Sequence, residues 1–196
     1  PWSHAGSDAN RDAYFARTGP ESPALEPPEW PFGPVGGGFE ATPVADAAGN
    51  AYVGATDGVF YSVAPSAPTR AGLERWSFQA PSPIRSAAAI KPLARDVPYM
   101  RVYFVTESGE MYALDGHGEV VWTHRLAGDV APGSAPALAG KPGTPVGSLM
   151  RIFIATSRGV VALEETGSSS DPDVRELWRE PLVVSDRSVA VRGDRV

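Results

Sequence analysis

The stretch RVYFVTESGEMYALD at residues 101–115 decides the fold, because the chain contains two further copies of its pattern. These are NAYVGATDGVFYSV at residues 50–63 and RIFIATSRGVVALE at residues 151–164. The aromatic residue near the head of each copy moves in steps of 51 and then 50 residues, as Tyr52, Tyr103 and Phe153. A repeat of about fifty residues is typical of solenoids, propellers and arrays.

Four strands are predicted in each repeat. A strand of small residues opens it, at 41–44, 86–90, 134–138 and 188–191. An aromatic and β-branched strand follows, at 51–55, 102–106 and 152–156, and a glycine-containing turn leads into a third, apolar strand. These turns contain Gly58, Gly109 and Gly159, and glycine takes the positive φ that tight hairpins require.

The fourth strand of each repeat carries a tryptophan. The residues in this position are Trp30, Trp76, Trp122 and Trp178. An indole ring buries a large apolar surface and has one N–H group that needs one acceptor, so a tryptophan can fasten one sheet to its neighbour. We therefore interpret these residues as structural, and we expect Trp76, Trp122 and Trp178 to occupy equivalent, mostly buried positions.

The predicted fold is an all-β propeller of four-stranded antiparallel blades. Residues 1–40 are expected to form an N-terminal arm with a partial blade strand around Trp30. Three blades follow within residues 41–184, at about 41–80, 86–126 and 134–182, and residues 188–196 open a further blade. Because a propeller closes with about 4–8 blades, we expect a fragment of a longer propeller, or remaining blades supplied by another chain.

Helices and disorder fit the sequence less well. No window sustains apolar residues at helical spacing, and the 21 glycines and 20 prolines interrupt almost every long stretch. The regular spacing of the aromatic residues argues against disorder between residues 41 and 182. Residues 20–34 are interpreted instead as a proline-rich arm, and residues 167–173 as a polar loop.

Residues 112–122, YALDGHGEVVW, resemble the tryptophan-docking repeat of the PQQ-binding-like β-propellers, in which Ala-Leu-Asp, a glycine turn and a tryptophan follow one another. The opening residues 1–32 are similar to the arm that precedes the first blade in that family. The pattern differs at residues 62–65, which replace Ala-Leu-Asp, and in the lengthened loop before Trp178. The resemblance implies a non-catalytic branch similar to the outer-membrane assembly lipoprotein propellers.

Charge and composition restrict the function. The net charge of −6 and the lack of a basic run argue against a nucleic-acid partner. No apolar stretch approaches the roughly 20 residues of a membrane-spanning helix, so any membrane association is expected to run through partners. The chain has no cysteine, which removes disulfides, thiolate metal sites and cysteine nucleophiles. It begins at Pro1 without an initiator methionine, as expected of a processed or truncated protein.

Residues with catalytic or metal-binding chemistry are few. His4, His117 and His124 are too scattered for a metal site, and Arg192-Gly193-Asp194 is ordinary turn chemistry. The carboxylates in predicted turns are Asp57, Glu107 and Asp115. The sequence has no calcium-loop or serine-nucleophile motif, and the glycine run at 36–38 does not precede a helix as a phosphate loop would. We predict no catalytic, cofactor-binding or metal-binding residue.

Two functions follow from these observations and the resemblance. The first is a non-catalytic scaffold or protein-binding subunit of a larger assembly, in a periplasmic or otherwise extracytoplasmic location that the resemblance alone implies. Its expected partners are other protein subunits or the rest of its own propeller. The second is a fragment of a quinoprotein dehydrogenase, whose relatives hold calcium and stack pyrroloquinoline quinone between a tryptophan and a vicinal cysteine pair. The lack of cysteine favours the scaffold, without a cofactor.

Overall fold

The computed structural model describes residues 32–33, 36–65, 72–91, 100–126, 130, 134–143, 149–168 and 170–181. The predicted partial strand around Trp30 and the predicted opening strand at 188–196 lie outside the described residues. Within the described ranges, every regular element is a β-strand and none is a helix. The all-β class is therefore confirmed.

The described strands form three four-stranded sheets. The first sheet contains β1 (Val44–Ala45), β2 (Ala51–Gly54), β3 (Val59–Pro65) and β4 (Gly72–Gln79). The second contains β5 (Ala89–Ile90), β6 (Val102–Val105), β7 (Glu110–Leu114) and β8 (Val120–Arg125). The third contains β9 (Ala137–Gly140), β10 (Met150–Thr156), β11 (Gly159–Gly167) and β12 (Pro172–Glu180). Consecutive strands pair antiparallel in each sheet, as in propeller blades, and the three sheets make an incomplete propeller.

One register is common to the three sheets. The aromatic residue of each second strand faces a residue of the opening strand, in the pairs Tyr52–Val44, Tyr103–Ala89 and Phe153–Ala137. Each tryptophan faces a small residue of the third strand, in the pairs Trp76–Ser62, Trp122–Ala113 and Trp178–Ala162. A β-bulge follows each of these tryptophan pairs. The sequence repeat is therefore a structural repeat, including the irregularity beside each tryptophan.

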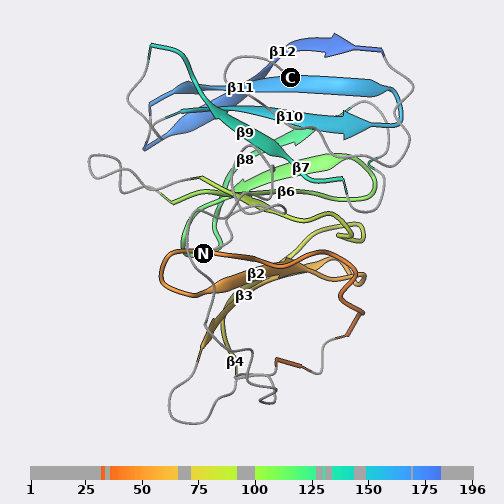
Figure 1. The fold of residues 1–196 in the computed structure, drawn as a ribbon, viewed down its shortest axis with the longest axis vertical. Helices are drawn as coiled ribbons and strands as arrows, with labels where there is room; N and C mark the ends of the chain where they lie inside the picture. The colour runs from red at the N-terminus through yellow and green to blue at the C-terminus, as the bar shows by residue number, and fades with distance from the viewer. Residues whose placement is uncertain are drawn as a thin grey trace, which may run out of the picture.

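The sheets follow one another along the long axis of the molecule in chain order (Figure 1). We call the side of a sheet that faces the next sheet its forward face, and the opposite side its rear face. Between the first and second sheets, Phe60 stacks on Phe104 with ring centroids 4.2 Å apart. Between the second and third sheets, Met111 and Ile154 belong to one buried cluster. Two apolar cores thus hold the three sheets together, as expected from the hydrophobic effect.

The rear face of the first sheet is covered by residues that precede it in the chain. Phe32 and Phe39 lie against Tyr61, with ring centroids 5.4 and 6.0 Å from that of Tyr61. Tyr61 is buried, whereas Phe39 is 41% exposed. The two phenylalanines therefore protect the apolar residues at this end of the stack from water.

The opening strands begin later than predicted. In the second and third sheets, the serine that was expected to start the strand does not pair through its backbone but forms a hydrogen bond through its side chain. Ser86 donates its hydroxyl to the carbonyl oxygen of Val105 at 2.9 Å, and Ser134 donates to that of Ala155 at 3.3 Å. These two buried serines occupy the same position of the repeat. Their hydroxyl groups bind backbone oxygens at a point in the chain before the residues of the opening strand that pair.

The predicted polar loop at 167–173 is wrong at both ends. β11 continues to Gly167 and β12 begins at Pro172, so only a short turn lies between them. Thr166 pairs with Asp173, and Gly167, with a φ of 80°, pairs with Pro172. The segment before Trp178 is therefore a longer hairpin and not a longer loop, because cross-strand pairing satisfies its backbone groups.

The three turn glycines all have positive φ, which is 84° at Gly58, 85° at Gly109 and 124° at Gly159. Gly58→Ala is expected to lower the free energy of unfolding by about 1–3 kcal/mol, the usual cost of a side chain in this conformation. The added Cβ would also lie 2.7 Å from the carbonyl oxygen of Ala80. Gly140→Ala is the matched control, since nothing lies within 4 Å of a Cβ there. Equal losses of stability in urea unfolding would contradict the prediction.

Candidate functional site

Trp76 anchors the first sheet to the second. It is half-buried on the forward face, with its ring centroid 6.0 Å from that of Tyr52. Its Nε1–H donates to the carbonyl oxygen of Gly116, in the β7–β8 turn, at 3.0 Å. The ring lies on Gly118, where an added Cβ would be 2.8 Å from the indole. One hydrogen bond and one contact that requires glycine therefore close this interface.

Trp122 closes the second interface in the same position of the repeat, and only 5% of it is exposed. Its Nε1–H donates to Oε1 of Glu165 in the third sheet at 3.1 Å. The same oxygen accepts the hydroxyl of Tyr103 at 2.8 Å, and Oε2 accepts the backbone N–H of Met150 at 2.9 Å. The fully buried Glu165 carboxylate thus satisfies three donors from two sheets.

Glu165 occupies the repeat position of Gly116, three residues after the residue that faces the tryptophan. In the second sheet the chain turns between Asp115 and Gly118, and the Gly116 carbonyl oxygen is available to Trp76. In the third sheet β11 remains paired as far as Gly167, and a side chain supplies the acceptor instead. Glu165 was not among the site residues predicted from the sequence. The third copy of the repeat could have indicated its role, because Glu165 stands there at the position of Gly116 in the second copy.

Two buried cations on the forward face of the second sheet accompany Glu165. Lys91 is 1% exposed and Arg101 is 3% exposed. Burial lowers the pKa of Lys91, and the negative charge of Glu165 opposes that lowering. Burial also raises the pKa of Tyr103 well above its ordinary value, and the charge and hydrogen bond of Glu165 raise it further. Charges of opposite sign therefore lie on the two sides of this interface, where removal of one of them leaves the other buried and less compensated.

Trp178 lies on the forward face of the third sheet, and its ring centroid is 6.0 Å from that of Phe153. It is 41% exposed. The expectation that it is mostly buried is therefore wrong, because no described sheet covers this face (Figure 1). The remaining predicted blade-docking residue, Trp30, lies outside the described residues.

A row of charged side chains crosses the same face. Arg151, Glu164 and Arg175 are cross-strand neighbours on β10, β11 and β12. The buried Glu164 carboxylate accepts from Arg151 at 2.9 Å and from Arg175 at 3.0 Å, and Nζ of Lys141 is 3.5 Å away. Burial acts to raise the pKa of Glu164, but the hydrogen bonds from Arg175 and Arg151 and the charge of Lys141 outweigh it and lower this pKa.

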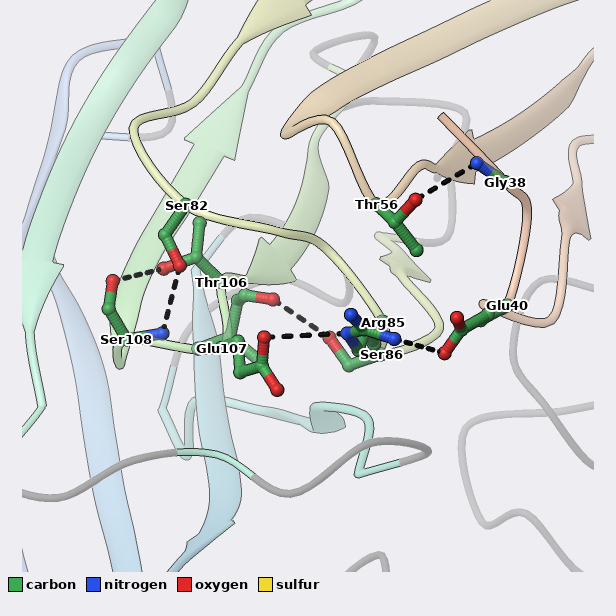
Figure 2. Close-up of polar contacts among 10 residues, drawn as sticks. Gly38, Glu40, Thr56, Ser82, Arg85, Ser86, Thr106, Glu107 and Ser108 are labelled. Atoms are coloured by element: carbon green, nitrogen blue, oxygen red, sulfur yellow. Dashed lines mark hydrogen bonds and ion pairs between the residues drawn. The ribbon is translucent and has the colours of Figure 1, made fainter. Parts of the chain in front are cut away.

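A second polar cluster joins the loops at one edge of the first two sheets (Figure 2). Arg85 forms ion pairs with Glu40 and with Glu107, the latter at 3.4 Å. The hydroxyl of Ser82 accepts the backbone N–H of Ser108 at 3.2 Å. A shallow depression beside Arg85 is lined by Ser86, Val105, Thr106, Glu107 and Val130. These contacts link the connection after β4 to the β6–β7 turn of the next sheet.

The glycine run at 36–38 belongs to this cluster and has a steric role. Gly38 donates its N–H to the hydroxyl of Thr56 at 2.9 Å (Figure 2). Its carbonyl oxygen accepts the Thr56 N–H at 3.0 Å. A Cβ on Gly37 would lie 2.5 Å from the backbone nitrogen of Asp57. Glycine is needed here because two backbone segments approach closely.

The predicted turn carboxylates and histidines do not gather into a site. Asp115 accepts the backbone N–H of His117 at 2.8 Å, as a turn aspartate does. His124 is half-buried on β8, and burial lowers its pKa. Among the described residues, no three His, Cys, Asp or Glu side chains are placed to hold a metal ion. His4 and Arg192-Gly193-Asp194 lie outside the described residues.

Trp122→Ala is expected to lower the free energy of unfolding by about 3–5 kcal/mol, as a large-to-small change in a core does. Trp178→Ala is expected to cost less, because 41% of that residue is exposed. Denaturant unfolding of the two variants and the unaltered chain measures both effects. Equal losses would show that a tryptophan is stabilised by its own sheet and not by the next one.

Acid is expected to remove the stabilisation that Glu164 provides. Because its pKa is lowered in the folded state, its contribution is present above the unfolded pKa and is lost as the pH falls through the folded value. The stability difference between the unaltered chain and Glu164→Gln should therefore shrink between about pH 7 and about pH 3. Urea unfolding at several pH values checks this. A difference independent of pH would contradict it.

No family model and no curated protein sequence matches this chain. Two solved structures are similar to parts of it. The crystal structure of BamB from Moraxella catarrhalis is 20% identical with a TM-score of 0.49, and the match covers 73% of this chain and 37% of BamB. A europium-containing methanol dehydrogenase is 12% identical with a TM-score of 0.44, and the match covers 69% of this chain and 23% of the dehydrogenase. The chain therefore spans less than half the length of either structure.

Proposed function

We propose that this chain is part of a non-catalytic β-propeller that binds other proteins in an extracytoplasmic assembly. The observation that carries the proposal is that the polar side chains with the most contacts fasten sheets and loops to one another, as Trp122 does through Glu165 and Arg85 does through Glu40 and Glu107. Such a stack presents surfaces of fixed shape, so that binding of a partner would immobilise few side chains that were mobile before.

The loop cluster of Figure 2 supports binding in preference to catalysis. Its one cation, Arg85, lies between the carboxylates of Glu40 and Glu107. The hydroxyls of Ser82 and Thr56 accept backbone N–H groups of neighbouring loops. These side chains hold the loops in place, which suits a surface that presents a fixed shape to a partner.

A quinoprotein dehydrogenase is the alternative to a scaffold. In such an enzyme calcium needs several oxygen ligands at one place, and the described residues contain no group of three acidic or histidine side chains that could hold a metal. The vicinal cysteine pair of those enzymes has no counterpart, since the sequence contains no cysteine. The described residues therefore offer no ligand set for the calcium ion and the sequence offers no cysteine pair for the quinone, which supports the scaffold as the first proposal.

The proposed assembly lies in the periplasm or another extracytoplasmic compartment. Within the part of the chain that the structure describes, no helix has the length and apolar character needed to cross a bilayer. In this proposal, partner proteins provide any attachment to a membrane. The location is supported by the resemblance of the repeat to extracytoplasmic propellers.

Incubation of the full-length protein with pyrroloquinoline quinone and Ca²⁺ is expected to give no quinone-dependent reduction of a dye acceptor with alcohols or sugars. The reason is that the described residues contain no group of three acidic or histidine side chains for the calcium ion, and the sequence contains no cysteine pair for the quinone. An established quinoprotein dehydrogenase, assayed in the same way, is the positive control. Saturable, quinone-dependent dye reduction would replace the scaffold with the dehydrogenase.

A further inference from the structure

His124 lies at the margin of the core between the second and third sheets. On β8 it pairs with Met111 of β7, which is buried in that core. Because residues that face each other across two strands lie on the same side of a sheet, the imidazole is on the forward face, as Trp122 is. The outer strands β8 and β12 lie against each other, and His124 is half-buried. The ring is therefore close to the third sheet and still reached by water.

An ion pair on β12 faces this position. Nη2 of Arg179 is 2.6 Å from Oε2 of Glu176. Glu176 pairs with Leu163, and Leu163 is buried in the core that contains Met111. Arg179 pairs with Val161, which belongs to the same core. Both charged side chains are therefore on the rear face of the third sheet, toward the second sheet.

The β-bulge of the third sheet makes this arrangement possible. Residues three positions apart point to opposite sides of a regular strand. The bulge between Glu176 and Trp178 adds one residue to β12, so that Glu176 and Arg179 come to the same side. The irregularity that accompanies the tryptophan thus also places an ion pair opposite His124.

The other charged groups near this interface are held elsewhere. Glu165, on the same rear face, accepts the indole N–H of Trp122. Arg125 and Glu110, on the strands that carry His124 and its partner, form an ion pair with each other on the opposite face of the second sheet. Among the described residues, the charges that face His124 are therefore those of the β12 ion pair.

A proton on His124 is unfavourable in the closed interface. Burial lowers the pKa of His124, the charge of Glu176 acts to raise it, and the charge of Arg179 lowers it further. The folded pKa is thus below the unfolded one, so the neutral imidazole favours the closed interface. As the pH falls below about 6.5, the ordinary pKa of histidine, an opened interface takes up a proton more readily than a closed one. Acid therefore favours opening.

We propose that His124 makes the contact between the second and third sheets sensitive to pH, so that acid loosens this interface more than the one before it. In the described part of the interface between the first and second sheets, no histidine is buried or half-buried. The two interfaces therefore differ in their response to acid. This property does not depend on whether the propeller binds proteins or acts as an enzyme.

The first measurement is an NMR titration of the His124 imidazole in the full-length protein, both folded and unfolded in urea. A lower pKa is expected in the folded protein. Arg179→Gln should raise the folded pKa and Glu176→Gln should lower it, because each removes one of the two charges that face the ring. A folded pKa equal to or above the unfolded one would overturn the proposal, and so would the absence or reversal of either shift.

The second measurement follows the interface through the indole N–H of Trp122, which is bound within it. Its hydrogen-exchange protection, corrected for the intrinsic effect of pH on exchange, should fall between about pH 7.5 and about pH 5.5. The limit is about tenfold, since a histidine with a pKa of about 6.5 is then about nine-tenths protonated in the open state. The indole N–H of Trp76, which donates to Gly116 in the other interface, should lose less protection.

His124→Gln should remove this acid response of Trp122. His117→Gln is the matched control, because His117 is exposed in the β7–β8 turn, and it should keep the response. Circular dichroism at neutral pH checks that both variants fold. If His124→Gln does not fold, Arg179→Gln decides, because a raised folded pKa should reduce the response. Equal losses at Trp76 and Trp122, or a response that persists in the deciding variant, would overturn the proposal.

Discussion

The arrangement of the sheets depends on one requirement. An indole N–H that points from one sheet toward the next must have a hydrogen-bond acceptor in that next sheet. A buried donor without an acceptor costs about 1–3 kcal/mol. Trp76 meets this requirement at Gly116 and Trp122 meets it at Glu165, at 3.0 and 3.1 Å. The β-bulge beside each tryptophan is a device that redirects a side chain. Each of these two hydrogen bonds joins one sheet to the next beside the apolar core between them.

The two interfaces meet this requirement with different chemistry. A backbone oxygen is always present and uncharged, so the first interface needs only a turn of the right shape. The carboxylate of Glu165 brings a negative charge into a buried place, and the cations Lys91 and Arg101 lie on the facing sheet. The longer β11–β12 hairpin is therefore linked to the charge of the whole interface, although the two features are distant in the sequence.

The sequence was sufficient to predict the sheets and their turns, because strand alternation and turn glycines such as Gly109 are local properties. It was not sufficient to predict the contacts of Glu165 or Arg85, because the partners of these residues come from other repeats. It also did not predict the exposure of Trp178. The same residue type in the same repeat position is buried or exposed according to what lies beyond its own sheet, and a repeat pattern contains no information about that neighbour.

The two ends of the stack are chemically different, which gives the array a direction. At one end, Phe32 and Phe39 already lie on Tyr61, so a sheet arriving there would first have to displace two aromatic rings. At the other end, the Trp178 side chain is partly exposed to water. A further blade can therefore pack on the tryptophan end of the described stack without rearrangement, whereas the opposite end already has an aromatic cover of its own.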